Sequence, residues 1–369
     1  MDKQQVLGAI YAAFPEQPIP TPEVFPEHVH PIERVRTPEF LSELAGKSWR
    51  DLTPEFCVRR RYYFQLLQPE SYAYYLPALL IGSLTPYSSD RDPIHSTVFA
   101  INPAFEAINH DGEDTYLRAR QAAFTEPQYR AVCDFLGLAL AEGERFDRFQ
   151  AAHGLRWGWN RYDTPALEAA KAYIHELCTF VYPESEDPET ADLCREIRTA
   201  FAATPYPGDD VLCDSQGEEP GEIAVGFRGV PWQSAHPQLL DCCSTALGFF
   251  TEAAFRYYLP VFMLAELLSK ELANVWDYYG NGDPLYHLTH RLYDESVEWK
   301  AFDMRKFTTS RMRCFHREER MAIIHYLEFQ LGKGYSIYST PEIKEALARY
   351  WRLSVTWGES ATDVTSVPE

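Results

Sequence analysis

Apolar residues recur at helical spacing along most of this chain. Near the N-terminus, Val6, Ile10 and Phe14 fall on one face of a helix over residues 5–14. The same spacing of three and four residues returns at 124–140 and at 315–331. Period-two alternation, which indicates strands, is confined to short stretches. The pattern therefore predicts a mainly α protein with minor β structure.

Other segments are assigned by their turn and cap residues. Helices at 164–180 and 340–353 both begin with Thr-Pro, which combines a good N-cap with a proline at the first helical position. The proline-rich segment 15–37 and the acidic, Gly/Pro-rich segment 205–231 predict surface loops. Short strands are expected at 96–101 or at 222–225.

The chain contains an internal repeat. The sequence Tyr-Tyr-Leu-Pro at 74–77 returns at 257–260, and each copy sits within a longer matching segment. Spacings are constant within each block and drift between blocks, as expected when packed elements are kept and loops change length. The matched pairs include Phe14 and Phe201, Trp49 and Trp232, Tyr75 and Tyr258, Asp92 and Asp283, Arg120 and Arg311, Phe124 and Phe315, and Thr164 and Thr340.

This duplication predicts two tandem homologous helical units, related by a pseudo-two-fold axis or set side by side. We place the first at 1–182 and the second at 188–355, because the link between them is acidic, short and bounded by prolines. Residues 356–369 lose all periodicity and are predicted to form a disordered tail.

A proline lies inside the signature helix of each unit. Pro77 and Pro260 lack an N–H and would clash with the carbonyl groups of Ala73 and Arg256. We therefore expect the helix to kink, or to break and restart, at these positions. A bend retained in both copies suggests that it packs the neighbouring tyrosines. Alternatively, the bend exposes carbonyls or a tyrosine hydroxyl in a pocket.

A tryptophan, a proline-initiated helix and an aromatic segment ending in Tyr-Tyr-Leu-Pro together resemble an uncharacterised family of bacterial domains of unknown function. Trp49 and residues 74–77 carry the resemblance in the first unit; Trp232, Phe255 and residues 257–260 carry it in the second. The resemblance implies that both units share the family's fold, and it implies no activity.

Charge narrows the range of partners. The formal net charge is −20, which disfavours nucleic acid and anionic membranes. Arg59, Arg60 and Arg61 form a local basic cluster without a counterpart in the second unit, which we interpret as a solvated helix face. The most apolar run, at 257–268, is shorter than the roughly 20 residues of a membrane span.

The 8 cysteines show no zinc-type spacing, and none occupies equivalent positions in both units. The N-terminus lacks the apolar region of a signal peptide. Free thiols in a reducing cytoplasm are the natural interpretation, with adjacent Cys242 and Cys243 as a buried structural pair.

Few residues suggest chemistry. His287 and His290 stand three residues apart and could share a helix face, but no acidic residue lies at a known ligand spacing. His316 and Glu319 are close enough for a surface contact. Phosphate-binding, nucleophile-elbow and zinc-protease motifs are absent from the sequence. We therefore predict no metal, no cofactor and no catalytic residue.

Two hypotheses remain. The first is a cytoplasmic interaction or inhibitor protein that binds a protein partner through an acidic, aromatic surface, and the electrostatic version of this hypothesis expects a basic partner. The second is an enzyme or small-ligand binder with its site between the two units or under the kink. The candidate binding residues are Tyr75, Tyr258, Arg120, Arg311, His287 and His290.

Overall fold

The described residues of the computed structural model are 1–24, 36–85, 94, 97–98, 101, 115–213, 218–273, 283–289, 311–333 and 340–355. Every regular element among them is a helix. The β pairing in this part of the chain consists of two isolated bridges, Val24 with Leu67 and Cys213 with Phe250. The mainly α class is confirmed.

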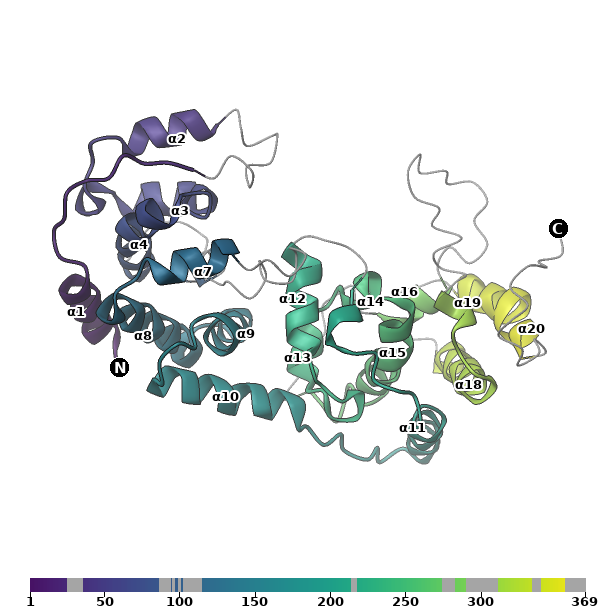
Figure 1. Cartoon of the computed structure of the whole chain (residues 1–369). Coiled ribbons are helices and arrows are strands. Elements are labelled where there is room, and N and C mark those ends of the chain that lie inside the picture. Colours follow the sequence, from purple (N-terminus) through teal and green to yellow (C-terminus); the bar gives the residue numbers. More distant parts are fainter. Residues whose placement is uncertain are drawn as a thin grey trace. The chain divides into compact units, whose positions relative to one another are not determined.

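The chain divides into two compact units, Met1–Glu176 (unit 1) and Leu177–Glu369 (unit 2), shown in Figure 1. The bounds expected from the sequence, 1–182 and 188–355, stay a prediction. The expected tail, 356–369, lies outside the described residues.

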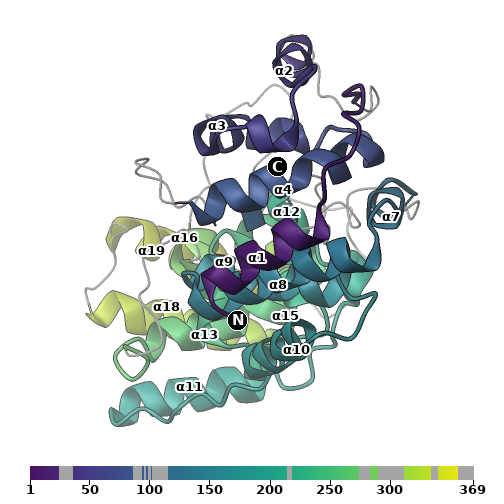
Figure 2. The ribbon, with the colours of Figure 1, turned by 90° about the vertical axis from the view of Figure 1, so that its left-hand side faces the viewer.

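Unit 1 is organised around α4, α1 and α8, and α1 lies along the other two helices (Figure 2). Its elements in chain order are α1 (Lys3–Ala13), α2 (Thr37–Leu44), the 3-10 turn η3 (Trp49–Asp51), α3 (Pro54–Phe64), α4 (Pro69–Leu84), α7 (Thr115–Ala122), α8 (Glu126–Glu142), α9 (Arg145–His153), the π-helical turn η4 (Gly154–Gly158) and α10 (Pro165–Cys178), which ends in unit 2.

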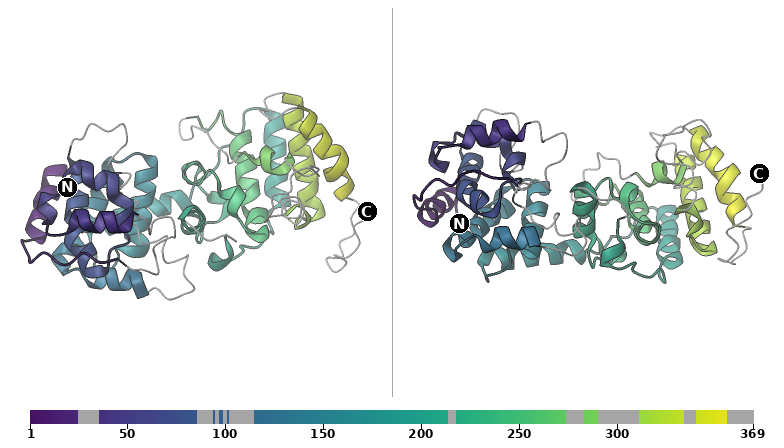
Figure 3. Two further views of the ribbon diagram at one scale, coloured as in Figure 1. Left: turned by 90° about the horizontal axis from the view of Figure 1, so that it is seen from above. Right: turned by 45° about the horizontal axis from the view of Figure 1, so that its top comes forward.

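Unit 2 repeats this arrangement, with α11 lying along α18 and also contacting α15 (Figure 3). Its elements are α11 (Pro188–Ala200), η5 (Asp209–Val211), α12 (Glu218–Phe227), η6 (Trp232–Ser234), α13 (Pro237–Cys242), α14 (Ala246–Phe249), α15 (Glu252–Leu267), α16 (Pro284–Thr289), α18 (Arg317–Lys333), α19 (Thr340–Ala346), the π-helical turn η7 (Leu347–Trp351) and α20 (Arg352–Ser354).

Two local predictions are wrong. The expected strand at 222–225 lies within α12, so the acidic segment around it is not a continuous loop. Pro220 falls in the first turn of α12, where a missing N–H costs no helical hydrogen bond. The alternative strand at 96–101 is also wrong where the structure describes it, because Thr97, Val98 and Ile101 are helical.

The signature helix continues through its proline in both units. Pro77 lies inside α4 and Pro260 inside α15, each helix being 16 residues long. The predicted break and restart is therefore wrong. Both prolines are buried, so packing on the surrounding helices compensates for the hydrogen bond that proline removes.

An aromatic chain closes the core of unit 1. The ring of Phe124 lies 6.5 Å from that of Phe14 and 5.5 Å from that of Trp159. The indole N–H of Trp159 donates to the carbonyl oxygen of Ile101 at 2.9 Å. Edge-on pairs of this kind each add about 0.5–1.5 kcal/mol beyond their buried area.

Unit 2 contains the same chain. Phe315 lies 6.1 Å from Phe201 and 6.1 Å from Trp351, whose indole N–H donates to the carbonyl oxygen of Leu288 at 2.9 Å. Trp351 thus occupies the environment that Trp159 has in unit 1. These two tryptophans are the matching residues at the end of the repeat.

This match corrects the last block of the sequence alignment. Thr164 begins α10 in unit 1, whereas Thr340 begins α19, which leads directly into η7 and Trp351. The counterpart of α19 is therefore α9, which leads into η4 and Trp159. The shared Thr-Pro is a helix start that both segments use independently.

Candidate functional site

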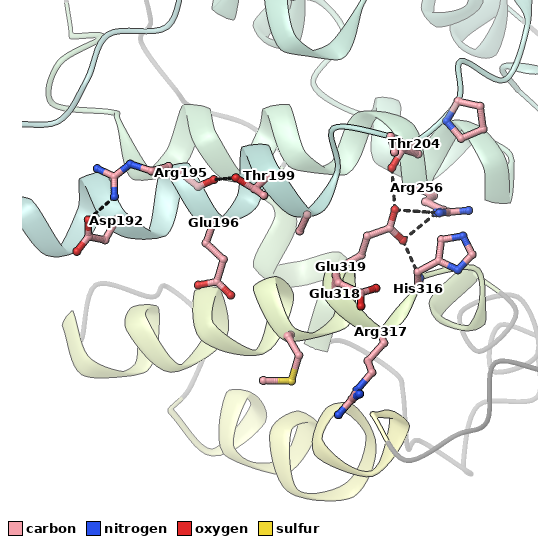
Figure 4. A pocket seen from close by; sticks show the side chains of 14 residues that line it. Asp192, Arg195, Glu196, Thr199, Thr204, Arg256, His316, Arg317, Glu318 and Glu319 are labelled. Atoms are coloured by element: carbon pink, nitrogen blue, oxygen red, sulfur yellow. Dashed lines mark hydrogen bonds and ion pairs between the residues drawn. The ribbon is translucent and has the colours of Figure 1, made fainter.

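One hollow in the described part of the chain is a groove in unit 2. It has a volume of about 900 Å³ and lies between α11 and the N-terminal turn of α18 (Figure 4). Residues 203–205, after α11, close one end, and Arg256 of α15 reaches its floor. We call this hollow the unit 2 groove.

A buried ion pair forms the floor of the unit 2 groove. The side chain of Glu319 is only 2% exposed and that of Arg256 is 17% exposed. Oε1 of Glu319 accepts hydrogen bonds from Nη2 of Arg256 at 2.9 Å and from the hydroxyl of Thr204 at 2.7 Å. Oε2 accepts from Nε of Arg256 at 2.9 Å and from the backbone N–H of His316 at 2.7 Å. The carboxylate is therefore saturated by its own protein.

Helix capping explains why Glu319 points inward. Glu319 is the third residue of α18, from which an acidic side chain can reach back to the N–H group that precedes the helix. Unit 1 has the same arrangement at the start of α8, where Oε1 of Gln128 accepts from the backbone N–H of Thr125 at 2.9 Å. Both units therefore cap this helix with the third helical residue, but only in unit 2 is that residue charged.

The predicted surface contact between His316 and Glu319 is wrong. Glu319 is buried and bonds to the backbone of His316. His325, further along α18, instead places its Nδ1 atom 2.7 Å from a carboxylate oxygen of Glu196 on α11. Glu196 and His325 thus link α11 to α18, as do Lys333 and Asp187, the N-cap of α11, at 3.4 Å.

The walls of the unit 2 groove carry charges of both signs. On α11, Arg195 pairs with Asp192 at 2.6 Å, and both side chains are largely exposed. On α18, Arg317 and Glu318 are exposed in the first turn. Such exposed charges are free to exchange their partners, because a surface ion pair contributes little to stability.

Unit 1 has a smaller hollow that partly overlaps the equivalent place. It has a volume of about 470 Å³ and includes Gln17, Ala73, Thr125 and Gln128. Ala73 occupies the position of Arg256, and Gln128 that of Glu319, so the floor carries no charge. We call it the unit 1 hollow. The two matching floor positions are therefore neutral in unit 1 and form an ion pair in unit 2, although Glu70 also lines the unit 1 hollow.

The candidate tyrosines lie in the core. Tyr75 is fully buried and shares its hydroxyl proton between the carbonyl oxygens of Leu44 and Lys47, both at 3.2 Å. Burial raises the pKa of Tyr75 to about 12. The two carbonyl groups flank Gly46, which has a φ of 71°. Glycine adopts this left-handed conformation at little cost, whereas other residues do so rarely. Tyr75 therefore fastens the turn that ends α2.

Tyr258 makes the matching contacts in unit 2. Its hydroxyl lies 2.8 Å from the carbonyl oxygen of Phe227 and 2.9 Å from that of Val230, on either side of Gly229 with φ of 67°. Burial is the main cause that raises the pKa of this hydroxyl. The second tyrosine of the signature thus has the same structural role in both units, and a role in binding stays a prediction.

The candidate arginines are buried over matching aromatic rings. Arg120 lies 4.4 Å from the ring centre of Tyr72, and Arg311 lies 5.2 Å from that of Phe255. The guanidinium of Arg311 also donates to the carbonyl oxygen of Leu247 at 2.6 Å and to that of Phe250. These carbonyls belong to α14 and the residue after it, where a cation is favourable. Neither arginine lines the unit 2 groove.

The two candidate histidines are not brought together in the described part of the chain. His287 lies on α16, half-buried against the ring of Phe255, and His290 lies outside the described residues. Among the described residues, groups of three or more potential metal ligands are absent. None of the described candidate residues lines the unit 2 groove.

One arginine of the basic cluster on α3 forms ion pairs with α2. Arg60 is mostly buried and donates to Glu43 at 2.8 Å and to Glu39 at 2.7 Å, both on α2. These two carboxylates raise the pKa of Arg60. The interpretation as a solvated face is therefore wrong for Arg60, while Arg59 is exposed.

A second polar cluster in unit 2 also escaped the sequence analysis. Tyr326 of α18 donates a hydrogen bond to Oε2 of Glu266, in the last turn of α15. Burial, and secondly the nearby carboxylate of Asp283, raise the pKa of Glu266 to about 8. Unit 1 has Ser83 and Phe135 in place of Glu266 and Tyr326. Comparing the copies for differences would have revealed both polar clusters.

The chain matches the model of one known protein family. Within the described residues, no helix is long and apolar enough to cross a bilayer. No curated protein and no solved structure matches the chain. The model of a family of unknown function, DUF6714, matches residues 33–162 and again residues 189–355. The two matches end just after Trp159 and Trp351, in agreement with the corrected repeat, and α10 lies outside both. The chain is therefore a tandem duplication that belongs to the family of unknown function DUF6714.

Proposed function

We propose that this chain acts by binding a protein partner in the unit 2 groove, without catalysis. The observation that carries the proposal is the saturated floor. Glu319 accepts five hydrogen bonds from Arg256, Thr204 and the backbone of His316, so its oxygens are engaged and unsuited to acid–base chemistry. The floor acts as a rigid base for the walls.

The walls of the groove suit a protein interface. Exposed charges on α11 and α18 border a strip formed by Ala200, Ala203 and Met321. An apolar centre with a polar, solvent-accessible rim is the usual anatomy of protein interfaces. The wall charges can re-pair with a partner at little cost, because Asp192 and Arg195 are already largely exposed.

Net charge supports a basic partner. A charge of −20 attracts cationic proteins over distances comparable to the Debye length, so association should be fast at low salt and weaker at high salt. The aromatic content gives less support than the sequence suggested, because the second tyrosine of each signature lies in the core. We therefore place the contribution of electrostatics above that of exposed tyrosines.

A reducing compartment, and hence the cytoplasm, is part of the proposal. All 8 cysteines are free thiols in the structure. Burial raises the pKa of Cys57 and Cys133 to about 12, so these thiols are poor nucleophiles. Buried, unpaired thiols are typical of proteins that remain in a reducing environment.

A small ligand in the same groove is the competing function. The volume of about 900 Å³ falls in the range of roughly 300–1,000 Å³ that holds small molecules. The earlier alternative of a ligand site between the two units stays a prediction.

The test is affinity capture from the host lysate at low and high salt, with mass spectrometry of bound proteins and small molecules. The wild type is compared with Thr199→Arg, which places a long side chain in the groove. The matched control is Ala12→Arg, because Ala12 is the equivalent exposed residue on α1 and does not line the unit 1 hollow. Both variants change the charge equally.

We expect a stoichiometric protein that is captured by wild type and Ala12→Arg, and bound at least tenfold more weakly by Thr199→Arg. Its loss at high salt would support a basic partner. Equal capture by both variants would exclude the unit 2 groove as the docking site. A metabolite in place of a protein would overturn the interaction proposal in favour of ligand binding.

A further inference from the structure

Three helices of unit 2 converge on one carboxyl group. Glu266 lies in the last turn of α15, and the hydroxyl of Tyr326 reaches it from α18. Asp283, which is 5% exposed, precedes α16 and accepts a hydrogen bond from the backbone N–H of Leu285 at 2.7 Å. Asp283 is thus both the N-cap of α16 and the charged neighbour of Glu266.

Among the described residues, none of the groups that shift the pKa of Glu266 is a cation. The elements packed against α15 are α11, α14, α16 and η6. Within the described residues, the group facing Glu266 from these elements is the carboxylate of Asp283, and α18 adds the Tyr326 hydroxyl. Two carboxylates in a partly desolvated site cannot both ionise without strong repulsion. Burial raises the pKa of both groups, and the N-cap hydrogen bonds oppose this at Asp283.

The cluster is specific to the second copy. Where unit 2 has Glu266, Tyr326 and Gln330, unit 1 has serine, phenylalanine and alanine at the matching positions 83, 135 and 139. The surrounding scaffold is otherwise shared. The fully buried Tyr75 on α4, for example, matches the fully buried Tyr258 on α15. Unit 1 therefore shows that the fold forms without this cluster. Because burying polar groups costs stability, the cluster is an addition that the scaffold does not need.

We propose that Glu266, Tyr326 and Asp283 form a proton-dependent latch that holds α16 against α15. While Glu266 carries a proton, it accepts the Tyr326 hydrogen bond beside an ionised Asp283 and the latch is closed. When the proton leaves to solvent, repulsion between the two carboxylates drives the start of α16 away from α15. This inference is independent of the proposed partner.

Opening of the latch would reach the aromatic core. The carbonyl oxygen of Leu288, in α16, accepts the indole N–H of Trp351 at 2.9 Å. Trp351 in turn lies against Phe315. Displacement of α16 therefore loosens the end of the aromatic chain, and the effect should be visible as faster exchange of the α16 amides.

The test is peptide-resolved hydrogen exchange of the full chain at about pH 6.5 and about pH 9. Glu266→Gln is the matched variant, because the amide keeps the shape and the acceptor of the protonated carboxyl group. Comparing the two proteins at the same pH cancels the intrinsic pH dependence of exchange. We expect equal protection of α16 at the lower pH, and at least tenfold faster exchange in the wild type at the higher pH.

A second variant keeps the proposal falsifiable. Asp283→Asn retains an N-cap side chain but removes the repelling charge, so α16 should stay protected at about pH 9. The peptide covering α8 in unit 1 should behave alike in all three proteins. Equal exchange of α16 in wild type and Glu266→Gln at the higher pH would overturn the latch. So would faster exchange that persists in Asp283→Asn.

Discussion

The unit 1 hollow and the unit 2 groove share part of their lining in two copies of one scaffold, yet the chemistry of the shared positions differs. In unit 1 the floor consists of Ala73 and Gln128, and in unit 2 of Arg256 and Glu319. Both copies keep the cap that starts the following helix. The difference teaches that the scaffold does not need a charged floor, and that unit 2 carries one in addition.

The largest expected effect tests the charged floor itself. Arg256→Ala leaves Glu319, which is only 2% exposed, without its main counter-charge. We expect a loss of about 3–5 kcal/mol in the free energy of unfolding of unit 2. Urea unfolding with peptide-resolved hydrogen exchange measures each unit separately.

The double variant Arg256→Ala with Glu319→Gln is the control, because it recreates the floor of unit 1. It should recover most of the loss, since no buried charge remains. If single and double variants lose the same stability, the ion pair is not what distinguishes the two floors.

A smaller effect should appear equally in both copies. Tyr75→Phe and Tyr258→Phe each remove a buried hydroxyl and leave the carbonyl groups of a helix end without that donor. We expect each to lower the free energy of unfolding of its own unit by about 1–3 kcal/mol. Under conditions in which the Tyr258→Phe variant remains folded, its affinity for the partner should equal that of the wild type. Weaker binding without a change in stability would place this tyrosine in a site.

A pH-dependent effect also distinguishes the units. His153 of unit 1 is 2% exposed, and neither ring nitrogen has a hydrogen-bond partner. Burial lowers its pKa to about 3. Between the unfolded pKa near 6.5 and this value, only the unfolded state binds the proton, so stability falls as the pH falls.

The expected slope is about 1.4 kcal/mol per pH unit in unit 1. His153→Leu should remove this slope, as measured by urea unfolding at a series of pH values. Unit 2 should show the opposite trend through Glu266. Its raised pKa of about 8 stabilises the fold below about pH 4.5, and this contribution is lost as the pH rises to 8. An unchanged acid slope in His153→Leu would assign the slope to other groups.

The sequence predicted the scaffold well, because packed helices leave repeating apolar positions. Helix starts at Thr53 and Thr125 follow from cap chemistry that is local in sequence. The helix α12 was missed because Pro220 and Gly221 suggest a turn, although a proline is tolerated in a first helical turn.

The floor of the groove could not be predicted in the same way. Arg256 and Glu319 are 63 residues apart, and only the packing of α15 near the start of α18 brings them together. The search for residues that match between copies found Tyr75, Tyr258 and Arg311, which are buried and bond to backbone carbonyl groups or pack on aromatic rings. Positions that differ between copies, such as Ala73 and Arg256, carry the information about the charged floor of the unit 2 groove.

The fastening of each signature tyrosine to its glycine turn has an evolutionary consequence. Gly46 and Tyr75, like Gly229 and Tyr258, depend on one another, because the turn places the carbonyl groups that the hydroxyl binds. A lineage that lost the glycine would misplace the acceptors and relax selection on the tyrosine. The pair should therefore be inherited or lost together, and a glycine at this distance before Tyr-Tyr-Leu-Pro is a marker by which remote relatives could be recognised.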